Sequence, residues 1–310
     1  MTDNVSIHPD FQSIKGIATN LKRLPLTLMN GFLSGVNSLY LRKYKTIVSH
    51  ETITGLDGHR VPLLIFTPEN LTSPSPALVY YHGGAFVLKQ APPHLDNAAR
   101  YAREANCRVI FVDYRLAPHH PFPAAFNDCY SALQWTLANA QRLGIDVSHI
   151  AVGGDSAGGA LAAGVAQKAM QEDGIKLCGQ LLIYPVTDSA CHWASVKRFA
   201  SVPPFKALPY IAVWEAYLGQ KLELGTPKYA APLQGDVAGT AVAYVETAQY
   251  DPLRDEGNAY AQTLIDKGIA VTHNETKGTV HGFDLLAANS AISKAAMTSR
   301  IEFLRKIFHS

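Results

Sequence analysis

The chain has 310 residues, of which 47% are hydrophobic and 17% charged, a composition that supports a sizeable core and excludes an intrinsically disordered protein. Lys and Arg number 27 against 25 Asp and Glu, so the net charge is +2, and no basic block interleaved with aromatic residues indicates a nucleic-acid partner. Nowhere does the sequence hold the roughly 18 uncharged apolar residues of a transmembrane helix, so we expect no membrane partner.

The cysteines and the N-terminal residues bear on the cellular compartment. The four cysteines lack Cys-x-x-Cys spacing, and in a chain of this length we expect free thiols in a reducing compartment. They are Cys107, Cys129, Cys178 and Cys191. No cationic segment followed by a long apolar run begins the sequence, so no secretory signal is predicted. We therefore expect a cytoplasmic protein, and the sequence leaves a homodimer open.

The first part of the chain is expected to be helical. Apolar residues recur at helical spacing over 11–24, ending before Pro25, and again over 32–40. Strand-like runs at 47–53 and 61–66 then flank a Gly-rich turn, which is typical of an antiparallel pair.

From there on, short apolar runs alternate with helical patterns. Strands are expected at 77–81, 108–112, 149–152, 180–184, 241–245 and 269–272, and helices at 95–106, 124–142, 156–171, 256–267 and 287–307. Apolar runs without alternation, separated by helices, indicate a buried and mostly parallel sheet with helices on both faces, an α/β fold. Residues 190–232 interrupt this rhythm with several prolines, and together with residues 1–45 they could form a lid over one end of the sheet.

The sharpest motif is Gly-Asp-Ser-Ala-Gly, centred on Ser156, between an expected strand and an expected helix. In such an elbow the nucleophile has a strained backbone and an exposed hydroxyl, and the flanking glycines let strand and helix approach closely. G-x-S-x-G alone is a weak signal. The alternative is a glycine-rich phosphate-binding turn, but the chain has neither G-x-x-x-x-G-K-[ST] nor G-x-G-x-x-G.

A second motif, His-Gly-Gly-Ala-Phe, begins at His82, at the end of an expected strand. Acyl transfer needs backbone N–H donors for an oxygen that becomes negative, and glycines let the backbone approach closely. In hydrolases with the elbow these donors come from such a loop and from the residue after the nucleophile, here Gly83, Gly84 and Ala157. The alternative is a plain Gly-Gly turn.

A serine nucleophile also needs a histidine and an acid, in the order Ser, acid, His. Four histidines follow the serine: His192, His273, His281 and His309. Of these, His281 is favoured because it lies in a loop after the last expected strand. Asp251, just after the strand at 241–245, is the candidate acid, whereas Asp255 fits better as an early helix carboxylate.

In their order along the chain, these motifs and Asp-Tyr-Arg-Leu-Ala-Pro at 113–118 resemble the hormone-sensitive-lipase-like esterases of the α/β-hydrolase superfamily. The resemblance runs from about residue 45 to the end. It implies an α/β-hydrolase fold with a catalytic domain at 46–189 and 233–310, and a helical cap formed by 1–45 and 190–232. It further implies a set of site residues, with no cofactor and no metal. These are the triad Ser156, Asp251 and His281 and the oxyanion donors Gly83, Gly84 and Ala157.

Two departures from the family pattern stand out. Ala85 takes the place of a frequent third glycine, so that loop has less backbone freedom. His119 and His120 follow Pro118 where the family has Glu, a residue expected to support an ion-pair network, so its absence bears on the rigidity of the loop. With no third ligand at recognisable spacing, the two histidines do not predict a metal site.

The function that follows is two-step hydrolysis of small, short-chain carboxylic esters through an acyl-enzyme. Bulky apolar side chains of the expected cap would limit the acyl pocket. They are Phe32, Leu39, Trp193, Phe199, Phe205, Tyr210 and Trp214. An amidase or peptidase with the same triad, and a non-catalytic ligand-binding member of the fold, are the alternatives; related receptors lack the catalytic histidine.

Overall fold

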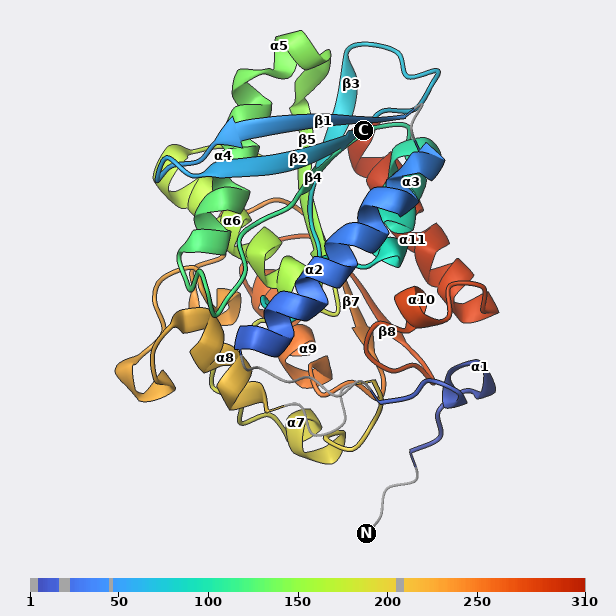
Figure 1. The fold of residues 1–310 in the computed structure, drawn as a ribbon, viewed down its shortest axis with the longest axis vertical. Coiled ribbons are helices and arrows are strands. Elements are labelled where there is room, and N and C mark those ends of the chain that lie inside the picture. Colours follow the sequence, from blue (N-terminus) through green and yellow to red (C-terminus); the bar gives the residue numbers. More distant parts are fainter. Residues whose placement is uncertain (1–4, 17–22, 45–46, 205–208, 310) are drawn as a thin grey trace.

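The computed structural model describes residues 5–16, 23–44, 47–204 and 209–309, and a sheet of eight strands runs through them (Figure 1). The strands are β1 (Val48–Thr54), β2 (Arg60–Phe66), β3 (Ser75–Tyr81), β4 (Arg108–Val112), β5 (Ile145–Asp155), β6 (Gly179–Ile183), β7 (Ala243–Ala248) and β8 (Val271–Thr276). Their order is β1-β2-β4-β3-β5-β6-β7-β8, in which β2 pairs antiparallel with β1 and β4 and the other pairs are parallel. The predicted α/β fold is confirmed.

Side chains of the central strands alternate between two apolar cores, as strand geometry requires. On β3, Val79 and Tyr81 join one core, whereas Leu78 and Tyr80 join the other. The first core is covered by α4 (Ala124–Ala138), α6 (Ala157–Asp173) and α9 (Arg254–Asp266), and the second by α3 (Pro92–Glu104) and α11 (Ala291–Phe308). The sheet therefore has helices on both faces.

The N-terminal helices differ from the prediction. Helix α1 covers only Pro9–Gln12 and residues 14–16 are not helical, so the apolar spacing from residue 11 does not form one long helix; residues 17–22 lie outside the described residues. Helix α2 spans Arg23–Tyr40 and contains Pro25 in its first turn. Proline is tolerated there because the first N–H groups of a helix have no intrahelical acceptor. Pro25 therefore marks the start of a helix and not the end of one.

Two segments far apart in sequence hold the loop after β3. Helix α2 crosses the front of the molecule in Figure 1, and its Asn37 side chain donates to the carbonyl of Gln90 (2.7 Å). Helix α8 (Tyr210–Leu218) places Tyr217 face to face with Phe86, with ring centroids 3.7 Å apart. The shorter elements are α5 (Ala140–Leu143), α7 (Ala194–Arg198), α10 (Phe283–Leu286), η1 (Leu41–Tyr44), η2 (Leu222–Leu224) and η3 (Pro232–Gln234).

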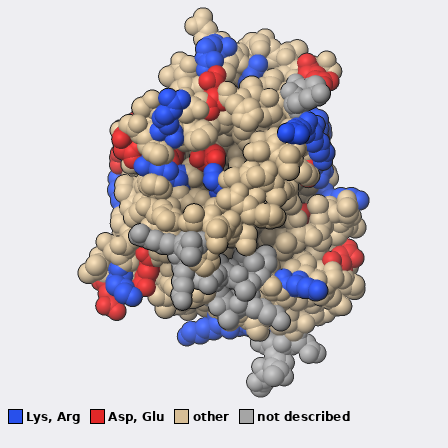
Figure 2. All heavy atoms as spheres, viewed as in Figure 1, with Lys and Arg blue, Asp and Glu red and all other residues tan. Residues whose placement is uncertain are grey.

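On the face shown in Figure 2, acidic and basic side chains are interspersed, and neither kind forms a continuous patch. Across the described ranges, no helix is long and apolar enough to span a membrane. All four cysteines carry free thiols: Cys107 and Cys129 are buried, and Cys178 and Cys191 are half-buried.

Candidate active site

Ser156 lies in the turn between β5 and α6, with φ 53° and ψ −119°. This left-handed region is costly for a residue with a Cβ, and such strain is typical of a nucleophile elbow. The glycines on either side are required by close packing. A Cβ at Gly154 would overlap with the carbonyl of Gly158, and a Cβ at Gly158 would overlap with the carbonyl of Tyr81. The serine side chain reaches the surface of a cavity although the residue is only 8% exposed.

Three side chains from different loops meet in a hydrogen-bonded row. His281, after β8, has its Nε2 2.9 Å from the Oγ of Ser156 and its Nδ1 2.7 Å from Oδ2 of Asp251, which follows β7. The other carboxylate oxygen of Asp251 accepts from the backbone of Leu253 (2.9 Å). The three residues picked out by the sequence therefore lie together at the carboxyl ends of parallel strands.

The acid and the histidines that the sequence analysis did not favour for the triad make other contacts. Asp255 accepts from the backbone of Ser195 (2.8 Å) and pairs with Arg254, so it ties α7 to α9. His273 has its Nε2 3.0 Å from the side-chain oxygen of Asn258, and His192 stacks on Trp193.

Burial and charge act in opposite directions on His281. Burial, the largest single cause, lowers the pKa of its imidazole, but the charge and hydrogen bond of Asp251, together with the charges of Asp155 and Asp284, raise the pKa above the usual 6.5. The same bond holds the ring with one nitrogen toward the acid and the other toward the serine. This is the arrangement that a general base for a hydroxyl requires.

The loop after β3 departs from the prediction at Gly83. Its N–H donates to Oδ2 of Asp155 (3.0 Å) and is therefore occupied. In the hydrogen bonds of the described residues, the N–H groups of Gly84 and Ala85 donate to no acceptor. Ala157 is the first residue of α6, so its N–H has no acceptor within the helix. The unoccupied donors beside Ser156 thus include Ala85, the residue at which the sequence departs from the family loop.

Two cavities meet at Ser156 and His281. The larger, about 350 Å³, is lined by Gly84 and His94, by Met29 of α2 and by Leu286 of α10. The smaller, about 30 Å³, is closed by a set of mostly apolar side chains: Phe86, Val186, Tyr210, Val213, Trp214 and Leu253. Of the expected cap residues, Tyr210 and Trp214 line the smaller cavity, whereas Phe32 and Leu39 are 67% and 62% exposed and point away. Phe205 lies outside the described residues.

His94 is a site residue that sequence reasoning missed. Its Nε2 lies 3.2 Å from Oδ2 of Asp155, whose other oxygen accepts from Tyr80 (2.9 Å). Burial would lower the pKa of His94, but the charge of Asp155 raises it. Behind it, burial and the nearby His94 lower the pKa of His82 to about 4, so His82 is neutral. The sequence holds no local signal for His94, because its partner lies 61 positions away in another element.

The loop after β4 is held without the family's Glu. Arg115 pairs with Asp128 (2.7 Å) and with Asp57 (2.6 Å), and His119 makes a hydrogen bond to Thr27 (3.1 Å). In the described part of the chain, no group of three or more His, Cys, Asp or Glu side chains could hold a metal ion.

Comparison with known proteins gives a consistent result. Residues 78–285 match the model of a family described as alpha/beta hydrolase fold. The chain is 33% identical to the carboxylesterase NlhH of Mycobacterium tuberculosis over the whole of both chains, and 36% identical to an ethyl acetate hydrolase of Pseudomonas putida over 76% of this chain and 75% of that one. Among solved structures, esterase LipW of Mycobacterium marinum superposes with a TM-score of 0.89 at 30% identity, covering 99% of this chain and 98% of the other.

Proposed function

This chain belongs to the alpha/beta hydrolase fold family, in its hormone-sensitive-lipase-like branch, and is a carboxylic ester hydrolase; on that premise we propose that Ser156, His281 and Asp251 are its catalytic triad. The observation that carries the proposal is the hydrogen-bonded row from the Ser156 hydroxyl to the Asp251 carboxylate. It supports the proposal because hydroxyl, imidazole and carboxylate follow one another in the order in which a serine hydrolase uses them.

The proposed reaction has two steps. The Oγ of Ser156 attacks the ester carbonyl carbon while Nε2 of His281 takes the hydroxyl proton, and the resulting imidazolium is stabilised by Asp251. The tetrahedral intermediate then collapses, the C–O bond to the alcohol breaks, and His281 returns the proton to the leaving oxygen. A water molecule, deprotonated by the same imidazole, next attacks the acyl carbon. The bond from that carbon to Oγ of Ser156 then breaks, His281 returns the proton to Oγ, and the acid is released.

For the oxyanion we propose the N–H groups of Gly84, Ala85 and Ala157. Their support is that none of these N–H groups donates to an acceptor among the described residues, whereas the N–H of Gly83 donates to Asp155. Donors that already point at the reacting oxygen need no reorganisation during the reaction, and each is worth about 10²- to 10³-fold in kcat.

We propose that the acyl group enters the smaller cavity and the alcohol group the larger one. A space of about 30 Å³ has room for a short chain only, and the rings of Tyr210 and Trp214 form its wall. The substrates would then be esters of short acids, at the lower end of the predicted range of roughly two to six carbons, with a range of alcohols. The name of the Pseudomonas relative, an ethyl acetate hydrolase, agrees with this size.

The proposal extends to organisation and location. Residues 1–45 and 190–232 would form a cap, which is supported by the contacts of α2 and α8 with the loop after β3. Four free thiols support action in the cytoplasm. The homodimer stays a prediction, which sedimentation of the purified protein would test.

The experiment uses a fluorophosphonate probe and matched p-nitrophenyl ester and p-nitroanilide substrates on the wild type, Ser156→Ala and Ser148→Ala. Ser148 is an exposed serine on the same strand, β5, and serves as the control. We expect labelling and ester turnover in the wild type and the control, and a loss of about 10⁶-fold in kcat in Ser156→Ala. Labelling of Ser156→Ala would overturn the nucleophile. Faster anilide than ester cleavage would favour the amidase alternative, and a wild type that is inert to both would favour a binding protein.

A further inference from the structure

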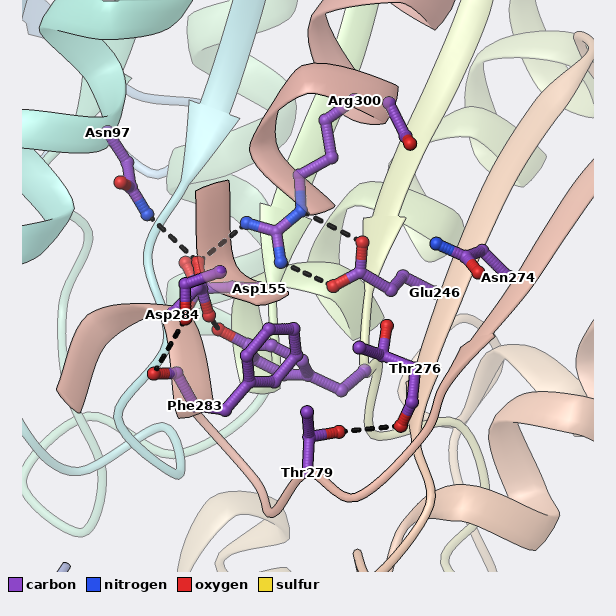
Figure 3. A network of polar contacts seen from close by, with 12 residues as sticks. Asn97, Asp155, Glu246, Asn274, Thr276, Thr279, Phe283, Asp284 and Arg300 are labelled. Carbon is purple, nitrogen blue, oxygen red and sulfur yellow. Dashed lines mark hydrogen bonds and ion pairs between the residues drawn. The ribbon is translucent and has the colours of Figure 1, made fainter. Parts of the chain in front are cut away.

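A fully buried cation that the proposed mechanism does not use lies behind the active site. Arg300, on α11, has no exposed surface and lies between two buried carboxylates, Glu246 on β7 and Asp284 on α10 (Figure 3). Its Nε donates to Glu246 (3.0 Å), its Nη2 also pairs with Glu246, and its Nη1 donates to Oδ2 of Asp284 (2.6 Å). A buried charge is retained only where it is paired, and breaking such a pair is strongly destabilising.

Asp284 connects this cation to the loop of the catalytic histidine. It lies three positions after His281, and it accepts a hydrogen bond from Asn97 on α3 (3.1 Å), as Figure 3 shows. Its Oδ1 accepts from the hydroxyl of Tyr184, just after β6 (2.6 Å). The ring of Tyr184 in turn packs edge-on against the His281 imidazole, with centroids 4.8 Å apart. The carboxylate of Asp284 therefore holds both the loop that carries His281 and the ring of Tyr184, against which the imidazole packs.

Asp284 acts electrostatically on both the His281 imidazole and Arg300. The titratable groups facing His281 come from every neighbouring element: Asp155 at the end of β5, Tyr184 after β6, Asp251 after β7, Asp284 on α10, His94 on α3 and Tyr210 on α8. Those facing Arg300 are Glu246 and Asp284, together with the phenols of Tyr80, Tyr101, Tyr184 and Tyr244. Burial lowers the pKa of His281, but the carboxylates of Asp251, Asp155 and Asp284 together raise it. Arg300 is the cation that offsets the charge of Asp284.

We propose that Arg300 is a positioning residue for His281, acting through Asp284 and Tyr184. It holds the loop after β8 in place and compensates the carboxylate charge behind the imidazole. The inference rests on the proposed function, because it takes His281 as the general base.

The test compares Arg300→Met and Asp284→Asn with a matched control, Arg305→Met. Arg305 lies on the same helix, is exposed and donates to the backbone carbonyl of Glu104. For each folded variant we would measure kcat and KM for a p-nitrophenyl ester from pH 5 to 9, and the rate of fluorophosphonate labelling. Circular dichroism and the melting temperature would report on the fold.

The two variants should shift the acid limb of kcat/KM in opposite directions. Without Arg300, the carboxylates of Glu246 and Asp284 are uncompensated, so the His281 pKa rises. As the pH decreases, activity should therefore begin to fall at a higher pH than in the wild type. In Asp284→Asn one of these charges is removed, so the limb moves to lower pH. Both variants should lose about 10- to 100-fold in kcat with little change in KM, because the imidazole is displaced from the serine. Arg305→Met should match the wild type.

A lower melting temperature with an unmoved acid limb, or a shift of both variants in one direction, would overturn the proposal and leave Arg300 a structural residue. If Arg300→Met does not fold, Asp284→Asn and Arg300→Lys are used instead. The acid limb of kcat/KM must then move to lower pH in Asp284→Asn and stay near that of the wild type in Arg300→Lys. Failure of the proposed function is distinguishable, since a wild type that resists the fluorophosphonate would show it before any variant is made.

Discussion

The N–H of Gly83 donates to Oδ2 of Asp155 at 3.0 Å, which ties the loop after β3 to the residue that precedes the nucleophile. The same oxygen lies 3.2 Å from Nε2 of His94, and its charge raises the pKa of that imidazole. The bond therefore orients the loop so that the next two N–H groups stay available.

Gly83→Ala should reduce kcat by about 10²- to 10³-fold, because the added Cβ would overlap with Oδ2 of Asp155 and force the loop away from the reacting oxygen. KM should change little. Gly31→Ala is the control, since a Cβ at that exposed position of α2 meets nothing within 4 Å. Steady-state kinetics of both variants would check this. Wild-type kcat in a folded Gly83→Ala would contradict the proposed arrangement of the loop.

Asp251→Asn should lower kcat by about 10⁴-fold while the protein stays folded, because an amide no longer stabilises the imidazolium or selects its tautomer. Asp255→Asn is the matched comparison. Asp255 is near in sequence but bonds to Ser195 and Arg254, so its loss should loosen α7 and leave the chemical step almost unchanged. Single-turnover kinetics on a nitrophenyl ester would separate the two. The reverse order of severity would identify Asp255 as the acid.

The acid limb of kcat/KM should have its midpoint above pH 6.5. The pKa of His281 is raised in the folded enzyme, mainly by Asp251 against the effect of burial, and only the neutral imidazole can accept the serine proton. Activity therefore falls as pH decreases through that raised pKa. In Asp251→Asn the residual activity should persist to lower pH. A wild-type profile that is flat from pH 8 to pH 4 would rule out a histidine base.

The sequence predicted those features that local pattern determines. The strand before Ser156 and the glycines around it can be predicted from a few neighbouring residues, because the elbow requires particular residue types at fixed positions. The order Ser156, Asp251, His281 can be predicted because each residue follows an expected strand. The structure brings these three side chains together at the carboxyl ends of parallel strands, and their catalytic roles stay a prediction.

What the sequence could not predict depends on pairing across the fold. The N–H of Gly83 donates to the carboxylate of Asp155, 72 positions away in the sequence, and Arg300 donates to Glu246, 54 positions away. No periodicity encodes such contacts. The single helix expected from residue 11 onward is wrong at residues 14–16 for a related reason. Phe11 lies in the single helical turn of α1 and packs on Phe283. The spacing of apolar residues alone does not distinguish such a turn from a long amphipathic helix.

The smaller cavity should set the acyl-length preference. In a p-nitrophenyl series from acetate to palmitate, each methylene that fits gains about 0.8 kcal/mol, or roughly fourfold in kcat/KM, until the chain meets the wall formed by α8. We therefore expect a maximum at roughly two to six carbons and a steep decline beyond it. Highest activity on palmitate, or strong activation at an oil–water interface, would contradict the short-chain preference.

Trp214→Leu tests which side chain forms that wall. Trp214 is buried and lines the smaller cavity, so replacing its ring with a shorter apolar side chain should move the maximum to longer acyl chains while activity on acetate falls, because the small group is held less closely. Trp135→Leu is the control, since Trp135 lies on α4 and lines neither cavity. If the chain-length profile of Trp214→Leu matched that of the control, the acyl group would have to occupy the larger cavity, and the assignment of the two cavities would be reversed.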